Sequence, residues 1–131
     1  MSEILIVDDE LSIRTTLKEF LVGEGHSVEV AADEEEAVRL AKQHRFDLVL
    51  LDIILKHSSG TDLMHEFRLV SPRTRIVLMT GYPTVESLAE AIRFGVTDYL
   101  FKPIDKDGLI MAVRRALNSI APFGAVNYAI A

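Results

Sequence analysis

The feature that most constrains the fold of this chain is the alternation of five short apolar runs with longer amphipathic segments. Short apolar runs are typical of buried strands, whereas apolar residues three or four positions apart are typical of helices that cover a sheet. Each predicted strand is followed by a helical pattern. This order predicts a doubly wound five-stranded parallel sheet flanked on both faces by five helices. The predicted strands are residues 4–7, 27–31, 47–51, 75–79 and 98–101.

The helical segments carry signals at their ends. Asp33, Thr84 and Asp105 are expected to cap helix N-termini, because their side chains can accept a hydrogen bond from a free backbone N–H. Glycines or a proline follow the helical patterns. The residues expected to face the sheet are Ile13, Leu17, Phe20 and Leu21 in the first helix, Ala37, Leu40 and Ala41 in the second, Leu63, Met64 and Phe67 in the third, Val85, Leu88, Ala89 and Ile92 in the fourth, and Leu109, Val113, Leu117 and Ile120 in the last.

Size and composition limit the classes of function. The 131 residues, 49% of them hydrophobic, suit one domain with a compact core. No cysteine is present, which excludes disulfides and thiol chemistry, and the four histidines lack the spacing of a zinc site. The net charge of −6 argues against a nucleic-acid surface in this domain.

The ends of the chain predict a cytoplasmic protein without a membrane anchor. The first residues run directly into the first apolar run, without the basic segment of a signal peptide, and no apolar run approaches the roughly 18 residues that span a bilayer. We expect a domain over residues 1–121. Residues 122–131 form an apolar tail. The sequence leaves three alternatives open for this tail: a truncated linker, a leftover of an artificially added segment, or a strap packed on the surface.

Polar residues follow four of the five predicted strands. Asp8 and Asp9 follow the first strand, Asp52 the third, Thr80 the fourth and Lys102 the fifth. The carboxyl ends of parallel strands meet at one edge of the sheet, where such folds bind ligands. Three carboxylates packed together would repel each other, and a divalent cation such as Mg²⁺, which prefers oxygen ligands, removes that repulsion. Each residue alone also fits a helix cap, a turn or a loop.

This set of residues resembles the receiver domains of two-component response regulators. The resemblance covers roughly residues 3–120 and rests on Asp8-Asp9, Asp52, Thr80-Gly81 and Lys102-Pro103. Tyr99, three residues before the lysine, stands where the family often has an aromatic switch residue. Gly60, eight residues after Asp52, also fits. The resemblance implies a flavodoxin-like sheet with the strand order 2-1-3-4-5.

The resemblance also implies a function. Asp52 would accept a phosphoryl group from a histidine kinase or phosphotransfer protein. Asp9, Asp52 and the backbone carbonyl of Ile54 would bind Mg²⁺ directly, and Asp8 mainly through water. Lys102 and Thr80 would contact the phosphoryl oxygens, and Tyr99 would turn into the space that Thr80 leaves. An output domain or protein would recognise the phosphorylated state at the surface of the fourth helix, fifth strand and fifth helix. Alternatively, a homodimer would form there on phosphorylation. The protein would be no conventional enzyme, since it would catalyse only its own phosphorylation and dephosphorylation.

The chain departs from the common family pattern near the acceptor. Lys56 stands where many members have a proline, and it is expected to be solvated, as is His57. Ile54 and Tyr82, two residues after Asp52 and Thr80, are bulky and lack a carboxylate or amide. We hypothesise that they hinder the attacking water and give a long-lived phosphoryl-aspartate.

Two other functions are alternatives. A receiver-like interaction module that is never phosphorylated typically lacks an acid or the lysine, and this chain keeps them all. An aspartate-based phosphatase commonly needs a second aspartate at the position of Ile54. A dinucleotide site of the Rossmann type is disfavoured, because Asp8 and Asp9 stand where glycines would cradle a pyrophosphate.

Overall fold

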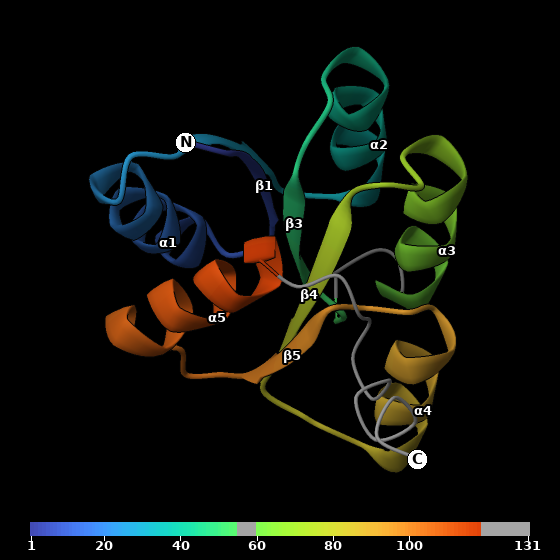
Figure 1. The fold of residues 1–131 in the computed structure, drawn as a ribbon. Coiled ribbons are helices and arrows are strands. Elements are labelled where there is room, and N and C mark those ends of the chain that lie inside the picture. Colours follow the sequence, from blue (N-terminus) through green and yellow to red (C-terminus); the bar gives the residue numbers. More distant parts are fainter. Residues whose placement is uncertain (55–59, 119–131) are drawn as a thin grey trace.

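The computed structural model describes residues 1–54 and 60–118, which form a five-stranded parallel sheet with helices on both faces (Figure 1). The strand order is β2-β1-β3-β4-β5, as the sequence resemblance implied. The elements are β1 (Glu3–Val7), α1 (Leu11–Gly23), β2 (Ser27–Ala31), α2 (Glu34–Gln43), β3 (Leu48–Asp52), α3 (Gly60–Val70), β4 (Arg75–Thr80), α4 (Val85–Arg93), β5 (Asp98–Phe101) and α5 (Lys106–Asn118).

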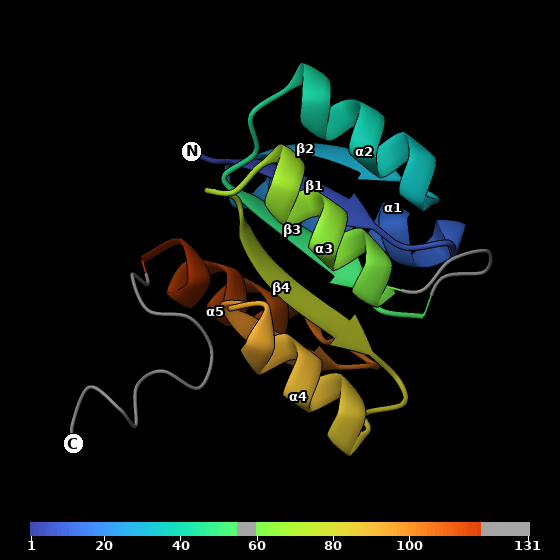
Figure 2. The same cartoon turned by 90° about the vertical axis from the view of Figure 1, so that its right-hand side faces the viewer.

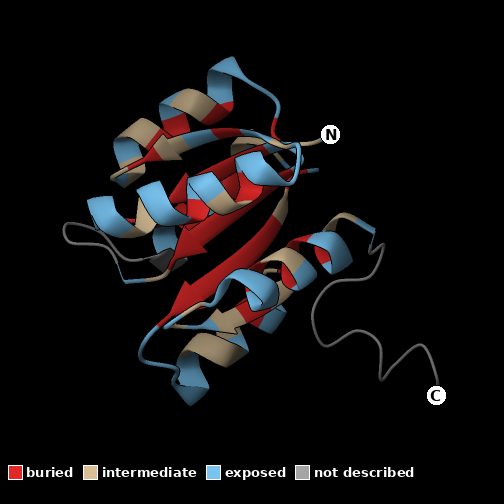
Figure 3. Cartoon of the chain, turned by 90° about the vertical axis from the view of Figure 1, so that its left-hand side faces the viewer, coloured by how far each residue is buried: buried red, intermediate tan, exposed pale blue. Residues whose placement is uncertain are grey.

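The three inner strands are buried on both faces, which is why they appear in the sequence as continuous apolar runs (Figure 3). Side chains alternate between the faces along each strand. In β1, Leu5 and Val7 pack with α2, α3 and α4, whereas Ile4 and Ile6 pack with α1 and α5. The same alternation in β3 and β4 divides the core into two apolar layers, one on each side of the sheet. Figure 2 shows the helices on the two sides of the sheet.

The helix ends confirm the predicted caps. The Asp33 carboxylate accepts a hydrogen bond from the Glu36 N–H at 2.9 Å, and Asp105 accepts one from the Gly108 N–H at 2.6 Å. Thr84 forms a capping box with Ser87, in which each side chain accepts the other's backbone N–H at 3.0 Å. Gly95, with φ of 66°, follows α4 in the left-handed region that favours glycine.

The face of α4 that meets the sheet differs from the prediction. Val85 is 81% exposed, Ile92 is 53% exposed and Ala89 is also exposed, whereas Ala91 is buried and Leu88 is half-buried. The apolar residues of α4 lie along one side of the helix, but that side is wider than the part that meets the sheet. The orientation is set by packing of Leu88 and Ala91 on the sheet, which leaves a stripe of apolar side chains exposed.

The Arg68 side chain of α3 connects three segments that are distant in sequence. Its guanidinium donates hydrogen bonds to the carbonyl oxygens of Phe94 at 3.1 Å and Gly95 at 3.0 Å, just after α4. A third bond, of 2.8 Å, reaches the Thr74 carbonyl, next to the first residue of β4. A charged donor satisfies the free carbonyls at a helix C-terminus, so Arg68 fixes that end of α4 to the rest of the domain.

We predict that Arg68→Met lowers the free energy of unfolding by about 2 kcal/mol, because several charge-assisted hydrogen bonds to carbonyls are lost together. Urea denaturation followed by circular dichroism measures the change. Arg93→Met is the matched control, since Arg93 is an exposed arginine that pairs with Glu90 within one helix, and it should change little. Equal stability of the Arg68 variant and the wild type would contradict the prediction.

Some predictions fall on residues outside the described part of the chain. They concern Lys56, His57, Ile120 and the tail at 122–131. Among the described residues, no helix combines the length and apolar character needed to cross a membrane.

Candidate functional site

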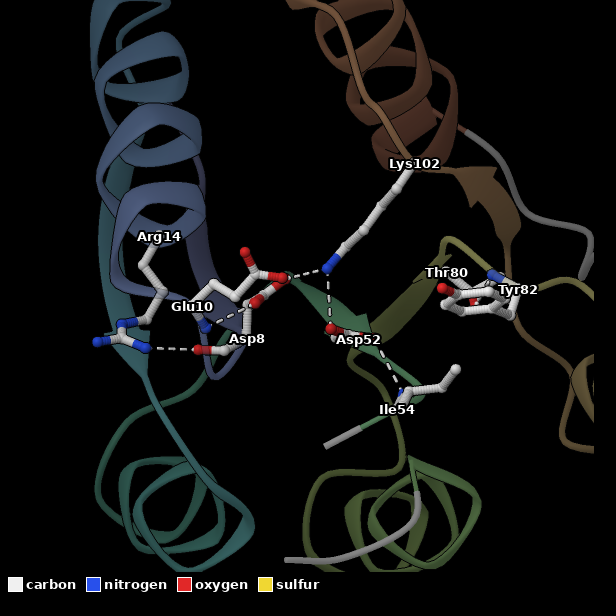
Figure 4. Close-up of polar contacts among 8 residues, drawn as sticks. All are labelled: Asp8, Glu10, Arg14, Asp52, Ile54, Thr80, Tyr82 and Lys102. Atoms are coloured by element: carbon white, nitrogen blue, oxygen red, sulfur yellow. Dashed lines mark hydrogen bonds and ion pairs between the residues drawn. The ribbon is translucent and has the colours of Figure 1, made fainter. Parts of the chain in front are cut away.

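The Lys102 ammonium group lies between two buried carboxylates at the carboxyl edge of the sheet (Figure 4). Its Nζ donates hydrogen bonds to Asp8 Oδ2 at 2.7 Å and to Asp52 Oδ2 at 2.9 Å. The three residues come from the ends of β1, β3 and β5, and the lysine is 94 residues away from Asp8 in sequence. The structure therefore brings together three of the residues that the sequence placed at this edge.

The strand order explains why these side chains meet here. β1 lies between β2 and β3. The chain passes from β1 to β2 on one side of it and then crosses to β3 on its other side. A crevice forms at such a switch point, outside the carboxyl ends of the strands. Val7 pairs with Leu51 in the parallel register, which places the next residues, Asp8 and Asp52, opposite each other.

Backbone amides hold the second oxygen of each carboxylate. The Glu10 N–H donates to Asp8 Oδ1 at 2.9 Å, and the Ile54 N–H donates to Asp52 Oδ1 at 2.9 Å. Arg14 donates from Nη1 to the Asp8 carbonyl at 2.7 Å and so fixes the backbone at the start of α1. Hydrogen bonds thus hold both oxygens of each carboxylate in place.

Burial dominates the electrostatics of Asp52. Desolvation raises the pKa of its carboxyl group above the ordinary value, although the hydrogen bonds from Lys102 and the Ile54 N–H act against this shift. For Lys102, desolvation acts to lower the pKa, but hydrogen bonds to Asp8 and Asp52 outweigh it and leave the pKa raised. The Lys102 ammonium group is therefore charged. Keeping Asp52 ionised in this buried site costs free energy, and a further positive charge would lower that cost.

Three acidic residues at the start of α1 have carboxylate oxygens within 4.8 Å of one another. They are Asp8, Asp9 and Glu10, and their oxygen-only chemistry fits a hard cation such as Mg²⁺. Sequence reasoning placed Asp8 and Asp9 here but missed Glu10, although the unbroken run of three acids was a visible signal. Asp52 does not belong to this mutually close group and lies across Lys102 from it.

Thr80 and its neighbours form the side of the site next to β4. Thr80 is buried at the end of β4, and its Oγ1 accepts a hydrogen bond from the Tyr82 N–H at 3.0 Å. The Lys102 N–H donates to the Thr80 carbonyl at 2.7 Å, which joins the ends of β4 and β5. The side chains of Ile54 and Tyr82 are both exposed, and they lie near Asp52 and Thr80 respectively (Figure 4).

Tyr99 on β5 points into the molecule and is only 6% exposed. Its hydroxyl lies 2.6 Å from Ser87 Oγ on α4, and its ring packs edge-on against Phe101 with a centroid distance of 5.5 Å. The resemblance implies that this ring turns toward the space that Thr80 leaves on phosphorylation. In the structure the ring lies inward.

A comparison with protein-family models decides the family. The model described as the response regulator receiver domain matches residues 4–114. The chain belongs to this family. Within this receiver domain, the matched segment contains the acidic residues of the crevice, Thr80, Tyr99 and Lys102.

Similar proteins agree with the assignment. The transcriptional regulatory protein ZraR of Escherichia coli (strain K12) is 36% identical to the receiver domain over 115 residues, which are 88% of this chain and 26% of ZraR. A CheY-like receiver domain protein from Methanospirillum hungatei JF-1 superposes with a TM-score of 0.87 at 30% identity, covering 90% of this chain and 94% of that chain. The receiver domain thus spans about a quarter of the curated relatives that it matches.

One solved structure similar to the receiver domain contains a modified acceptor. It is a response regulator from Burkholderia pseudomallei, described with a phosphorylated aspartic acid, a calcium ion and citrate. It superposes with a TM-score of 0.82 at 27% identity, covering 90% of this chain and 69% of that chain.

We predict that Lys102→Met destabilises the receiver domain in metal-free buffer by roughly 2–4 kcal/mol, because it leaves two buried carboxylates without their shared counter-charge. Mg²⁺ should restore more stability to this variant than to the wild type. Thermal and urea denaturation with and without EDTA measure both effects. Lys106→Met is the control, because Lys106 is exposed. If both lysine variants are equally stable, Lys102 does not hold the acidic crevice together.

Proposed function

We propose that this receiver domain is a phosphorylation-dependent switch in which Asp52 accepts a phosphoryl group from a histidine kinase or phosphotransfer protein. The observation that carries the proposal is the Lys102 ammonium group, which contacts both Asp8 and Asp52 at the switch point of the sheet. A buried carboxylate with a fixed cation and a neighbouring acidic group is the arrangement that phosphoryl transfer needs, because the reaction depends on positioning and charge neutralisation.

The proposed transfer moves one phosphoryl group between two side chains. An Asp52 oxygen attacks phosphorus, the P–N bond of the donor phosphohistidine breaks, and the electron pair of that bond stays on the imidazole. Asp52 then carries an acyl phosphate, which water later cleaves to release inorganic phosphate. Lys102 pairs with a phosphoryl oxygen, and the Thr80 hydroxyl donates to another.

Mg²⁺ is the proposed cofactor. Asp9, Asp52 and the Ile54 carbonyl would hold it directly and Asp8 through water. The close oxygens of Asp8, Asp9 and Glu10 support a hard cation at this position. When bound, the ion neutralises charge on the carboxylates and on the incoming phosphoryl group. The calcium ion and phosphorylated aspartic acid described for the Burkholderia pseudomallei regulator support both parts of the proposal.

The proposed output surface is the face of α4, β5 and α5. The exposed apolar side chains of these three elements include Val85, Ile92, Phe101 and Met111. Contiguous apolar surface is typical of protein interaction sites. A downstream domain or protein, or a second copy of this domain after phosphorylation, would bind there and read the position of α4.

The proposed setting is a longer cytoplasmic regulator. The curated relatives are named transcriptional regulatory proteins, and this domain spans only about a quarter of ZraR. We propose that residues 1–121 form the receiver and that residues 122–131 form a tail or the start of a linker. Contacts to nucleic acid would then come from another domain, which agrees with the net charge of −6.

The central test is labelling with acetyl phosphate. We expect the intact mass to increase by one phosphoryl group in the presence of Mg²⁺, to stay unchanged with EDTA, and to stay unchanged in Asp52→Asn. Asp33→Asn is a matched control, because it removes a carboxylate from the N-cap of α2 and keeps a good capping residue. Label that persists in Asp52→Asn, or no label in the wild type, would overturn the proposal in favour of an interaction module.

The lifetime of the phosphoryl group tests the roles of Ile54 and Tyr82. We propose that these exposed, bulky side chains beside the crevice slow attack by water. The double variant Ile54→Asn, Tyr82→Glu should lose its label about tenfold faster or more, because an amide and a carboxylate can orient the attacking water. The decay is followed after removal of acetyl phosphate. Ile54→Leu with Tyr82→Phe keeps the bulk and should decay like the wild type, and equal rates in both double variants would refute the idea.

A further inference from the structure

The Ser87 side chain joins Tyr99 to the N-terminus of α4. Ser87 Oγ lies 2.6 Å from the Tyr99 hydroxyl and 3.0 Å from both the N–H and the carbonyl oxygen of Thr84. These residues come from β5, the first turn of α4 and its cap. One hydroxyl group therefore connects the aromatic residue with the capping box that starts the helix.

The hydrogen-bonding capacity of Ser87 fixes the direction of each contact. A serine hydroxyl donates one hydrogen bond and accepts up to two. The Thr84 N–H can only donate and the Thr84 carbonyl can only accept, so Ser87 accepts from the first and donates to the second. The Tyr99 hydroxyl must then donate to Ser87 Oγ. All three contacts can form together only while the Tyr99 ring points inward.

Among the residues that the structure describes, the side chains in the N-terminal half of α4 are exposed or only half-buried. Val85 and Glu86 are exposed, Leu88 is half-buried, and Ala91 is the buried residue of the helix. The far end is fixed, because Arg68 binds the carbonyls of Phe94 and Gly95. α4 is thus tied firmly at its C-terminus and, near its N-terminus, by the contact between Ser87 and Tyr99.

The same segment leads directly to Thr80. The Thr80 hydroxyl accepts the Tyr82 N–H, and Thr84 follows two residues later as the helix cap. A short stretch of backbone therefore connects Thr80 with the cap of α4, and the Ser87 hydroxyl connects that cap with Tyr99.

We infer that Ser87 is a positioning residue that holds Tyr99 inward in the unphosphorylated domain. Its regulatory meaning rests on the proposed function. If an inward Tyr99 belongs to the signalling state, the Ser87 hydroxyl biases the domain toward that state before phosphorylation. One neutral hydrogen bond shifts a two-state ratio about fivefold, which is enough to set the resting population and too little to lock it.

The test measures the environment of the Tyr99 ring by ¹⁹F NMR of protein labelled with 3-fluorotyrosine. The chain has three tyrosines, and Tyr99→Phe identifies the signal. In Ser87→Ala without phosphate, we expect the Tyr99 signal to move toward the solvent-exposed position, with a roughly fivefold change in the population ratio. Ser87→Thr keeps the hydroxyl and should keep the wild-type signal.

Thr84→Ala separates the proposed contact from fraying of the helix. This variant removes the other half of the capping box and keeps the Ser87 hydroxyl. The inference is overturned if Ser87→Ala leaves the Tyr99 signal unchanged, or if Thr84→Ala exposes the ring as strongly as Ser87→Ala does.

Labelling of Asp52 by acetyl phosphate and Mg²⁺ is measured on the same samples by intact mass. Ring exposure in Ser87→Ala without any labelling of the wild type would refute the proposed function and leave the Ser87 contact standing. Labelling of the wild type without ring exposure in Ser87→Ala would refute the Ser87 contact alone. In labelled Ser87→Ala, the ring should return inward, and failure to do so would overturn the regulatory reading.

Discussion

The contact of Lys102 with Asp8 and Asp52 is the interaction on which the charged edge of this domain depends. The two carboxylates are buried at the ends of adjacent strands, and the lysine reaches them from the far side of β4. The observed strand order lets one side chain contact both acids. The ammonium group offsets the repulsion between the two carboxylates, which would otherwise oppose folding. Burial nevertheless raises the pKa of the Asp52 carboxyl group.

Stability and function are divided between different parts of the molecule. The apolar strands β1, β3 and β4 are buried on both faces and supply the packing that keeps the charged edge in place. A buried ion pair on its own contributes little net stability, because desolvation offsets the attraction. The charged edge therefore relies on the core behind it, and binding of a cation or phosphoryl group can change its energetics without disturbing the sheet.

Helix α4 covers the sheet with only part of its apolar side. Leu88 and Ala91 pack on the sheet, and several other apolar residues of that side remain exposed. Arg68 fixes its C-terminal end, whereas its N-terminal end is connected through Ser87 to Tyr99. In the proposed switch, α4 would be the element that changes position.

The sequence by itself determined the sheet, the strand boundaries to within one residue, and the arrival of Asp8, Asp9, Asp52, Thr80 and Lys102 at one edge, because parallel strands point their carboxyl ends the same way. The strand order came from the family resemblance. The third acid, Glu10, was visible in the sequence and was missed. The exposed face of α4, the Arg68 contacts and the inward Tyr99 were decided by tertiary structure. Local spacing indicates the apolar side of α4 but not which part of that side meets the sheet, and contacts such as that of Arg68 with Gly95 depend on how distant elements pack.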